Sequence, residues 1–434
     1  MAENTMKVDI IGREIIKPSS PTPSHLKTFK LSFLDQIVPA VYTSLVLFYP
    51  NINVLTPDQT SNHLKKSLSE ALTLFYPLAG RVKDNTVIEC HDDGAQYVEA
   101  KFNCLLSIFL DQQHKDEALI RRFLPAAMES PEAGTWPLLI VQATFFDCGG
   151  VAVGVCVSHK LADAATLSVF LKTWANTAVP DFEAASYYLP RDTFSFAPPA
   201  ALELKRVEGV SKRCVFDKST IAALKAKLVS DSVKQPTKVE VVTALLWRCL
   251  MAASSSAQVT PRYSLVTQSV DMRKRVEPPF SQNSAGNLVS YFALQVENNI
   301  YEGSTEPLEC QLQGLVAKLR QGIKDFTERK AKRFRGDEGL QAVVEHFMEG
   351  RKLVTRDDVC YFFCTSWCNF QFYEVDVGFG KPVYVTVPSN TYENMILFMD
   401  TRDGDGVEVI FTLSKENVAL FENQLEILSL ASSN

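Results

Sequence analysis

The apolar positions along the chain follow two periods, which predict amphipathic helices and buried strands. Apolar residues three or four positions apart run from Leu64 to Phe75, as on one face of a helix. The sequence TPDQ at 56–59 precedes them as a capping box with proline at the first helical position, and Pro77 follows them. Residues 151–157 (VAVGVCV) form a short, β-branched, glycine-flanked apolar run, typical of a buried strand. The chain is therefore predicted to be an α/β protein.

Both periods recur along the rest of the chain, without an internal repeat or the regular strand–helix alternation of a barrel. The further helices that they predict lie at 167–174, 221–228, 237–247, 312–326 and 343–348. The further strands that they predict lie at 86–90, 96–102, 215–217, 361–363, 370–373, 395–399 and 407–412.

Length and composition indicate two domains. The chain has 434 residues, 46% of them hydrophobic, which is enough for a large core and too long for one ordinary domain. The segment 180–201 is rich in proline, serine and aromatic residues and has no periodicity, as in a loop between domains. We expect an N-terminal domain over 1–180, a crossing loop over 181–214 and a C-terminal domain over 215–434. A segment near 360–382 is expected to return to the first domain.

Charge and residue usage argue against several classes of protein. The net charge is −6, and no basic stripe is interleaved with aromatic residues as nucleic-acid binding needs. The basic cluster RKAKRFR at 329–335 is interpreted as a solvated helix face or loop. No apolar segment resembles a signal peptide or approaches the ~18 residues of a membrane span. We therefore expect a soluble, cytoplasmic protein that binds neither nucleic acid nor membranes.

Metal chemistry and covalent catalysis are both disfavoured. Cys360, Cys364 and Cys368 are evenly spaced, but four residues of a strand advance ~13 Å, too far for shared ligation of one ion. The sequence DGDG at 403–406 lacks the ligand spacing of a calcium loop and is interpreted as a hairpin turn. Cys156 lies in the buried strand, where a thiol is usually a small apolar residue rather than a nucleophile.

His159 is the best candidate for a catalytic residue. It stands where the buried strand ends, and Asp163 follows four residues later. Imidazole is the usual side chain for taking a proton near neutral pH, since its unperturbed pKa is ~6.5. From the residues alone, Asp163 either orients the ring or braces the fold, because this spacing near a turn need not bring the carboxylate to the imidazole.

Seven segments together resemble the plant BAHD acyltransferase family, which moves acyl groups from coenzyme A thioesters to alcohols or amines. They are LDQ at 34–36, YPLAGR at 76–81, HKLAD at 159–163, VDMR at 270–273, GN at 286–287, TSW at 365–367 and DVGFG at 376–380. They occur in the family's order and span nearly the whole chain. The opening IKPSSPTP at 16–23 resembles the alkaloid- and alcohol-acetylating branch that includes vinorine synthase.

The resemblance implies an α/β, two-domain chloramphenicol-acetyltransferase-like fold with a solvent tunnel between the domains and His159 midway along it. His159 would take the acceptor's proton as its oxygen attacks the thioester, then deliver a proton to the departing thiolate in a ternary complex. The Thr365 hydroxyl and the Trp367 indole N–H are the candidate donors to the developing oxyanion. Asp163 is expected to be structural, paired with Arg273.

Further site residues follow from the resemblance. Asp376, Gly378 and Gly380 mark a structural loop, and its two glycines predict a positive φ or a close backbone approach. The family's usual DFGWG stands here as DVGFG, so two aromatic residues are replaced by smaller side chains. The expected coenzyme A contacts are Gly286, Asn287 and Ser290. The expected acceptor-side contacts are Tyr42, Thr43 and Ser44, with a buried strand end as the alternative.

The sequence therefore predicts an acyl-CoA-dependent O-acyltransferase. We expect it to move acetyl from acetyl-CoA to a hydroxyl of a plant specialised metabolite, an alkaloid or terpenoid alcohol. It is expected to be a monomer that needs no metal. A non-catalytic relative that binds coenzyme A or a metabolite, and a thioesterase-like hydrolase, remain as alternatives. The sequence does not identify the acceptor, because residues from many loops line such a site. One methylene more or less changes the discrimination between substrates by only ~1 to 3 kcal/mol.

Overall fold

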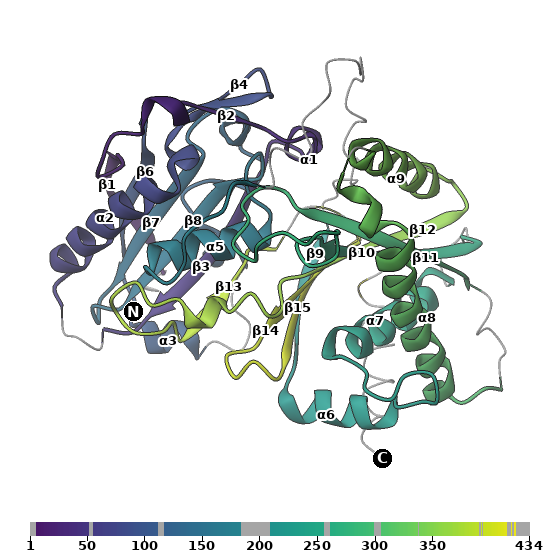
Figure 1. Ribbon diagram of the computed structural model, residues 1–434. Helices are drawn as coiled ribbons and strands as arrows, with labels where there is room; N and C mark the ends of the chain where they lie inside the picture. Colours follow the sequence, from purple (N-terminus) through teal and green to yellow (C-terminus); the bar gives the residue numbers. More distant parts are fainter. Residues whose placement is uncertain are drawn as a thin grey trace. The chain divides into compact units, whose positions relative to one another are not determined.

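The structure is a computed structural model that describes residues 6–51, 55–111, 117–183, 209–255, 261–298, 305–336, 338–389, 392, 394–414, 418 and 421. The chain divides into two compact α/β units (Figure 1). Unit 1 consists of Met1–Ala201, Phe280–Leu288 and Phe370–Pro388. Unit 2 consists of Leu202–Pro279, Val289–Asn369 and Ser389–Asn434.

This division differs from the expected one in two places. Phe280–Leu288, expected in the C-terminal domain, belongs to unit 1, where its last residues are hydrogen-bonded to Asp35 and Asp163. The returning segment begins at residue 370 rather than near 360, because Val359–Ser366 is a strand of the sheet in unit 2. Most of the predicted crossing loop, 184–208, lies outside the described residues, and its end is already strand β9.

Unit 1 is built on a six-stranded sheet. Its strands, in order across the sheet, are β1 (Val8–Ile16), β6 (Ala95–Phe102), β7 (Leu139–Phe146), β8 (Val151–Ser158), β3 (Tyr42–Tyr49) and β13 (Tyr384–Thr386). β3, β7 and β8 are buried along their whole length, as expected for central strands. A small second sheet contains β2 (Thr28–Lys30), β5 (Val87–Glu89) and β4 (Arg81–Lys83).

The helices of unit 1 are α1 (Phe33–Ile37), α2 (Pro57–Leu74), α3 (Leu106–Leu110), α4 (Glu117–Arg122) and α5 (Ala164–Trp174). The predicted capping box at the start of α2 is confirmed, with the Thr56 and Gln59 side chains each accepting from the other's backbone N–H. α2 and α5 pack side by side over the sheet (Figure 1). Phe109 and Phe123 pack with sheet residue Phe48 in an aromatic core, which fixes α3 and α4 to the strands.

Unit 2 has its own six-stranded sheet. Its strands, in order, are β11 (Val289–Glu297), β10 (Tyr263–Asp271), β12 (Val359–Ser366), β14 (Met395–Asp400), β15 (Val407–Leu413) and β9 (Val210–Phe216). The helices are α6 (Lys218–Lys227), α7 (Lys238–Ser255), α8 (Leu308–Arg329) and α9 (Gly339–Val354). α7 and α8 pack against each other beside the sheet (Figure 1). The DGDG segment is a turn between β14 and β15, as predicted.

The strand predicted over 370–373 is wrong. This segment turns and enters a short 3-10 helix, Phe372–Glu374. Asn369 and Gln371 adopt positive φ values of 70° and 61°, which break an extended strand. The aromatic residues that favoured a strand instead pack locally, with the Phe370 and Phe372 rings 6.0 Å apart.

No helix within the described part of the chain is both long enough and apolar enough to cross a membrane. No group of three His, Cys, Asp or Glu side chains among the described residues is placed to hold a metal ion. All ten cysteines are free thiols, and several of them are buried.

Candidate active site

His159 directly follows the last residue of β8. Its backbone N–H donates to the carbonyl of Val41 at 2.8 Å, next to the point where β3 begins. β3 and β8 are antiparallel, with Tyr42 opposite Ser158. The strand pair therefore holds the His159 backbone rigidly, while its side chain stays partly exposed. A buried strand that ends in a partly exposed imidazole suits a base that must meet a substrate.

The imidazole of His159 contacts Asn287. Its Nδ1 lies 2.9 Å from Asn287 Oδ1, and Asn287 Nδ2 donates to the backbone carbonyl of His159 at 2.7 Å. Asn287 Nδ2 also donates to Asp35 Oδ1 at 2.8 Å. The contact connects the loop after β8 with α1 and with the 286–288 segment, all within unit 1.

Burial lowers the pKa of His159 below its usual value. The imidazole's own backbone carbonyl, the charge of Asp163 and the Asn287 hydrogen bond act in the opposite direction. The Lys160 charge lowers the pKa further. Because the net shift is downward, the imidazole is neutral near pH 7 and can accept a proton.

Asp163 binds backbone N–H groups with both carboxylate oxygens. Oδ1 accepts from Thr166 N at 2.7 Å and caps the N-terminus of α5. Oδ2 accepts from Leu288 N at 3.0 Å, and the residue is 5% exposed. These contacts are structural, because a carboxylate that caps a helix and also accepts from a neighbouring segment fixes the local backbone.

Three successive backbone N–H groups fasten the 286–288 segment. Gly286 N donates to Thr166 Oγ1 at 3.1 Å, and Asn287 N donates to Asp35 Oδ1 at 2.8 Å. The third is the Leu288 N–H on Asp163 described above. Gly286 has a φ of 122°, which favours glycine. The Asn287 side chain was expected to contact coenzyme A, but its polar atoms are hydrogen-bonded to His159 and Asp35.

Lys160 ties the loop after β8 to the end of α1. Its Nζ donates to the carbonyls of Gln36 at 3.1 Å and Val38 at 2.5 Å. The side chain is buried, and burial lowers its pKa to about 8. The sequence offered no signal for this contact, because lysine is rarely buried.

Of the three predicted acceptor-side residues, two point into the core of unit 1. The Tyr42 hydroxyl donates to the Pro137 carbonyl at 2.6 Å, and Ser44 Oγ donates to Cys156 Sγ at 3.3 Å. Tyr42 and Cys156 both belong to the aromatic core cluster, and burial raises the Cys156 pKa to about 11. Thr43 alternates to the other face and donates to the Ala162 carbonyl at 3.3 Å, inside the HKLAD segment. Only Thr43 remains a candidate.

Four of the predicted residues belong to unit 2: Arg273, Ser290, Thr365 and Trp367. Thr365 Oγ1 accepts from Ser269 Oγ at 3.0 Å, which leaves the Thr365 hydrogen available to another acceptor. Ser290 Oγ is buried and has no hydrogen-bond partner among the described residues. Arg273 is 1% exposed and donates to Asp271 Oδ1 at 3.0 Å.

The DVGFG loop is a structural element of unit 1. Asp376 Oδ1 accepts from Gly378 N at 2.8 Å and from Gly380 N at 2.9 Å. The expected positive φ is found at both glycines, 100° and 81°. His63 on α2, to which the sequence assigned no partner, lies 2.9 Å from the Val377 carbonyl through Nε2.

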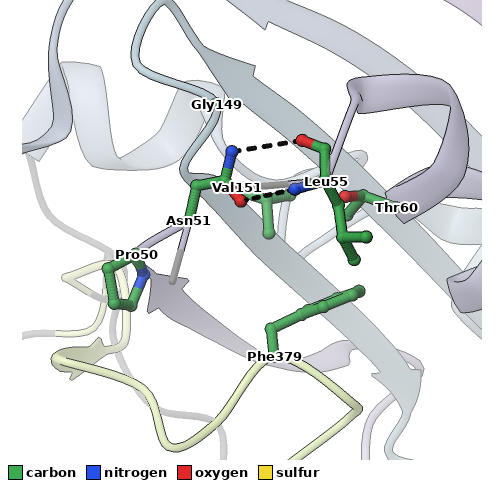
Figure 2. Close-up of a pocket in the computed structure, with 7 residues that line it drawn as sticks. All are labelled: Pro50, Asn51, Leu55, Thr60, Gly149, Val151 and Phe379. Atoms are coloured by element: carbon green, nitrogen blue, oxygen red, sulfur yellow. Dashed lines mark hydrogen bonds between the residues drawn. The ribbon is translucent and has the colours of Figure 1, made fainter. Parts of the chain in front are cut away.

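A small, shallow hollow lies at the start of β8 (Figure 2). Its lining residues are Pro50, Asn51, Leu55, Thr60, Gly149, Val151 and Phe379. Asn51 forms two hydrogen bonds with the Leu55 backbone, of 3.1 and 3.0 Å. Val151 begins β8 whereas His159 follows its end, so an extended strand of roughly 25 Å separates the hollow from the imidazole. The hollow therefore lies far from His159, the candidate catalytic residue.

Known proteins match this chain over almost its whole length. Residues 6–428 fit the family model described as Transferase family. The chain is 34% identical to salutaridinol 7-O-acetyltransferase of Papaver somniferum, with 98% of each protein covered. It is 35% identical to limonoid 7-O-acetyltransferase of Citrus sinensis, again with 98% of each covered. The crystal structure of vinorine synthase is similar, with a TM-score of 0.83 and 32% identity over 98% of each chain.

The similarity to vinorine synthase confirms the expected two-domain, chloramphenicol-acetyltransferase-like α/β fold. The relatives are O-acetyltransferases by name, in agreement with the acyltransferase motifs around His159. Since the family model and these relatives extend over nearly all of the sequence, the chain belongs to the Transferase family of plant BAHD acyltransferases, in its vinorine-synthase-like branch.

Proposed function

We propose that this protein transfers acetyl from acetyl-CoA to a hydroxyl group of a plant specialised metabolite, an alkaloid or a terpenoid alcohol. The names of the two acetyltransferases above support both acceptor classes. The observation that carries the proposal is His159, a partly exposed imidazole with a lowered pKa on a rigid strand end. Such a group is prepared to accept a proton at neutral pH.

The proposed reaction is a direct transfer without a covalent enzyme intermediate. His159 accepts the acceptor's hydroxyl proton while the oxygen forms a bond to the thioester carbonyl carbon. The carbon–sulfur bond then breaks, and the imidazolium returns the proton to the coenzyme A thiolate, so protons and electron pairs balance. The Thr365 hydroxyl and Trp367 indole N–H stay our candidates for binding the oxyanion. Thr365 Oγ1 accepts a hydrogen bond from Ser269, so its own hydrogen can be donated to the oxyanion, which supports this role.

Roles for the remaining predicted residues also belong to the proposal. Asp163 acts as a brace, and its pairing with Arg273 stays a prediction. Ser290 is our candidate for a coenzyme A contact, supported by its buried, unpartnered Oγ. Thr43 is our candidate for the acceptor side. We further propose that the enzyme is a cytoplasmic monomer, which a fluorescent fusion in plant cells and sedimentation of the purified protein would test.

The direct test is to incubate the protein with acetyl-CoA and a hydroxylated-metabolite extract from its source. Mass spectrometry should find products heavier by one acetyl group. His159→Ala should abolish their formation, while calorimetry should still detect coenzyme A binding. Full turnover by this variant would overturn the role of His159.

The same assay separates the two alternatives. A non-catalytic relative would bind coenzyme A or metabolite calorimetrically without product. A hydrolase would release coenzyme A at equal rates with and without the acceptor. The altered DVGFG loop is the feature that motivates the non-catalytic alternative, but the glycine conformation and the Asp376 hydrogen bonds that shape the loop are in place.

A further inference from the structure

We propose that Asp35 is a positioning residue for His159, acting through Asn287 to hold the imidazole in the tautomer whose Nε2 can accept a proton. The inference rests on the proposed function, because it concerns the same base. It also gives a role to two sequence motifs that the reaction itself does not use, LDQ at 34–36 and GN at 286–287.

The orientation of the Asn287 amide follows from its neighbours. Asn287 Nδ2 lies 2.8 Å from Asp35 Oδ1 and 2.7 Å from the His159 carbonyl, and both of these atoms can only accept. The NH2 group must therefore occupy this side, and Oδ1 must face His159. The opposite orientation would place the amide oxygen against two acceptors.

The amide orientation then decides the tautomer of His159. Asn287 Oδ1 lies 2.9 Å from His159 Nδ1, and an amide oxygen can only accept a hydrogen bond. Nδ1 must therefore carry the hydrogen, which leaves the lone pair of the neutral ring on Nε2. Without this contact, the ring is free to adopt the other tautomer, in which Nε2 carries the hydrogen and cannot act as the base.

Asp35 is itself held as an acceptor. It is fully buried, and Ser32 N and Ser32 Oγ donate to its Oδ2 at 2.9 and 2.7 Å. Asn287 N and Nδ2 both donate to its Oδ1 at 2.8 Å. Burial raises the pKa of Asp35 above its usual value, although these donors act in the opposite direction. With N–H or O–H donors on both oxygens, the carboxylate is used entirely as an acceptor, which strengthens each hydrogen bond.

The geometry also fixes the position of Asp35 relative to the loop after β8. Ser32 and Asp35 form the capping box of α1, so the carboxylate belongs to a rigid turn. Lys160 binds the carbonyls of Gln36 and Val38 at the other end of the same short helix. The buried turn around α1 therefore supports the His159 loop at two points, through Asn287 and through Lys160.

The experiment measures the tautomer directly. In protein labelled with 15N at the histidine rings, wild-type His159 should show a protonated Nδ1 and an unprotonated Nε2 at pH 8, assigned by comparison with His159→Ala. Asp35→Asn and Asn287→Leu should both lose this pure Nδ1–H pattern. We expect kcat to fall about 10- to 100-fold in each, as for other groups that orient a catalytic imidazole, with KM for acetyl-CoA within about twofold.

Two controls separate positioning from a general loss of structure. Asp92→Asn alters another hydrogen-bonded carboxylate of unit 1, which accepts from Thr22 and Lys27, and should change neither the tautomer nor kcat. The double variant Asp35→Asn/Asn287→Leu should be no slower than Asn287→Leu alone, because both changes break one chain of contacts. If Asp35→Asn does not fold, Asn287→Leu alone still tests the tautomer.

An Nε2–H tautomer in the wild type would overturn the inference, as would a variant that keeps both the Nδ1–H pattern and full kcat. Additive losses in the double variant would also contradict it. The tautomer is read without substrate, so a protein that acetylates nothing but shows the expected ring nitrogens would reject only the proposed function.

Discussion

Asn287 Oδ1 lies 2.9 Å from His159 Nδ1, although the two residues are 128 positions apart in the chain. Asp163, only four residues from His159, instead binds the backbone N–H groups of Thr166 and Leu288. The residue that faces the imidazole is therefore the distant amide, whereas the nearby carboxylate holds the backbone at the start of α5 and at Leu288, next to Asn287. This division of roles leads to opposite expectations for substitutions at the two positions.

Substitutions at Asp163 should act mainly on stability. Asp163→Ala removes the N-cap of α5 and the acceptor of Leu288 N, which should lower the free energy of unfolding by about 1 to 3 kcal/mol. Asp163→Asn keeps an oxygen for the cap and should lose less. Denaturant unfolding of the three proteins checks the order. A role in proton transfer would instead give Asp163→Ala with unchanged stability and a large loss of kcat.

The rate of transfer should stay high in mildly acidic solution. The proposed base, His159, can accept a proton only when it is neutral, and burial lowers its pKa below the usual ~6.5. As the pH falls, the imidazole remains neutral until the pH approaches this lowered pKa. The acidic limb of kcat/KM should therefore have its midpoint below pH 6.5 in a pH profile. A midpoint above that value, with an acceptor that does not titrate there, would contradict a lowered pKa of His159.

A covalent route through Cys156 should be absent. Cys156 is fully buried, receives a hydrogen bond from Ser44, and has its pKa raised to about 11, so it is a thiol at neutral pH. Cys156→Ala should keep kcat within about threefold, since a small apolar side chain replaces another. Intact-mass measurement after mixing with acetyl-CoA should show no acetylated enzyme. An acetyl adduct that disappears in Cys156→Ala would reject direct transfer.

The predictable part of the fold and site is the part with local signals. The α2 capping box, the buried strand β8 and His159 at its end each depend on a few neighbouring residues. Strand β1 was not predicted, because this edge strand exposes Ile10 and Ile11 and shows no clean alternation. Asp35 and Asn287 are 252 positions apart in the chain. No local pattern indicates that the carboxylate of a helix cap also accepts hydrogen bonds from so distant a residue.

Gly378 tests the shape of the DVGFG loop. It has a φ of 100°, and a Cβ there would lie 2.3 Å from His63 Nε2. Gly378→Ala should therefore lower the free energy of unfolding by about 2 to 4 kcal/mol through backbone strain and overlap. In the double variant Gly378→Ala/His63→Ala, the overlap is removed, so its loss should be smaller than the sum of the two single losses. Urea unfolding of all four proteins measures this coupling. Strictly additive losses of unfolding free energy would show that the loop moves to accommodate the Cβ without contacting His63.

His346 should make unit 2 sensitive to acid. The ring lies among Tyr291, Phe326 and Phe334, its Nε2 lies 2.9 Å from the Tyr291 carbonyl, and its Nδ1 has no hydrogen-bond partner among the described residues. Burial, with a contribution from the Lys330 charge, lowers its pKa to about 4. Between this value and the ~6.5 of the unfolded chain, the unfolded state binds more protons, so stability falls as the pH falls.

The pKa difference at His346 corresponds to about 2 kcal/mol lost between pH 7 and pH 5, and about 3 kcal/mol by pH 3. His346→Phe cannot titrate and should lose correspondingly less stability over the same range, even if it is less stable at pH 7 because the Tyr291 carbonyl loses its donor. Urea unfolding of both proteins at pH 7 and pH 5 measures the difference. Parallel pH dependence in the two proteins would mean that His346 is protonated in the folded state as easily as in the unfolded chain.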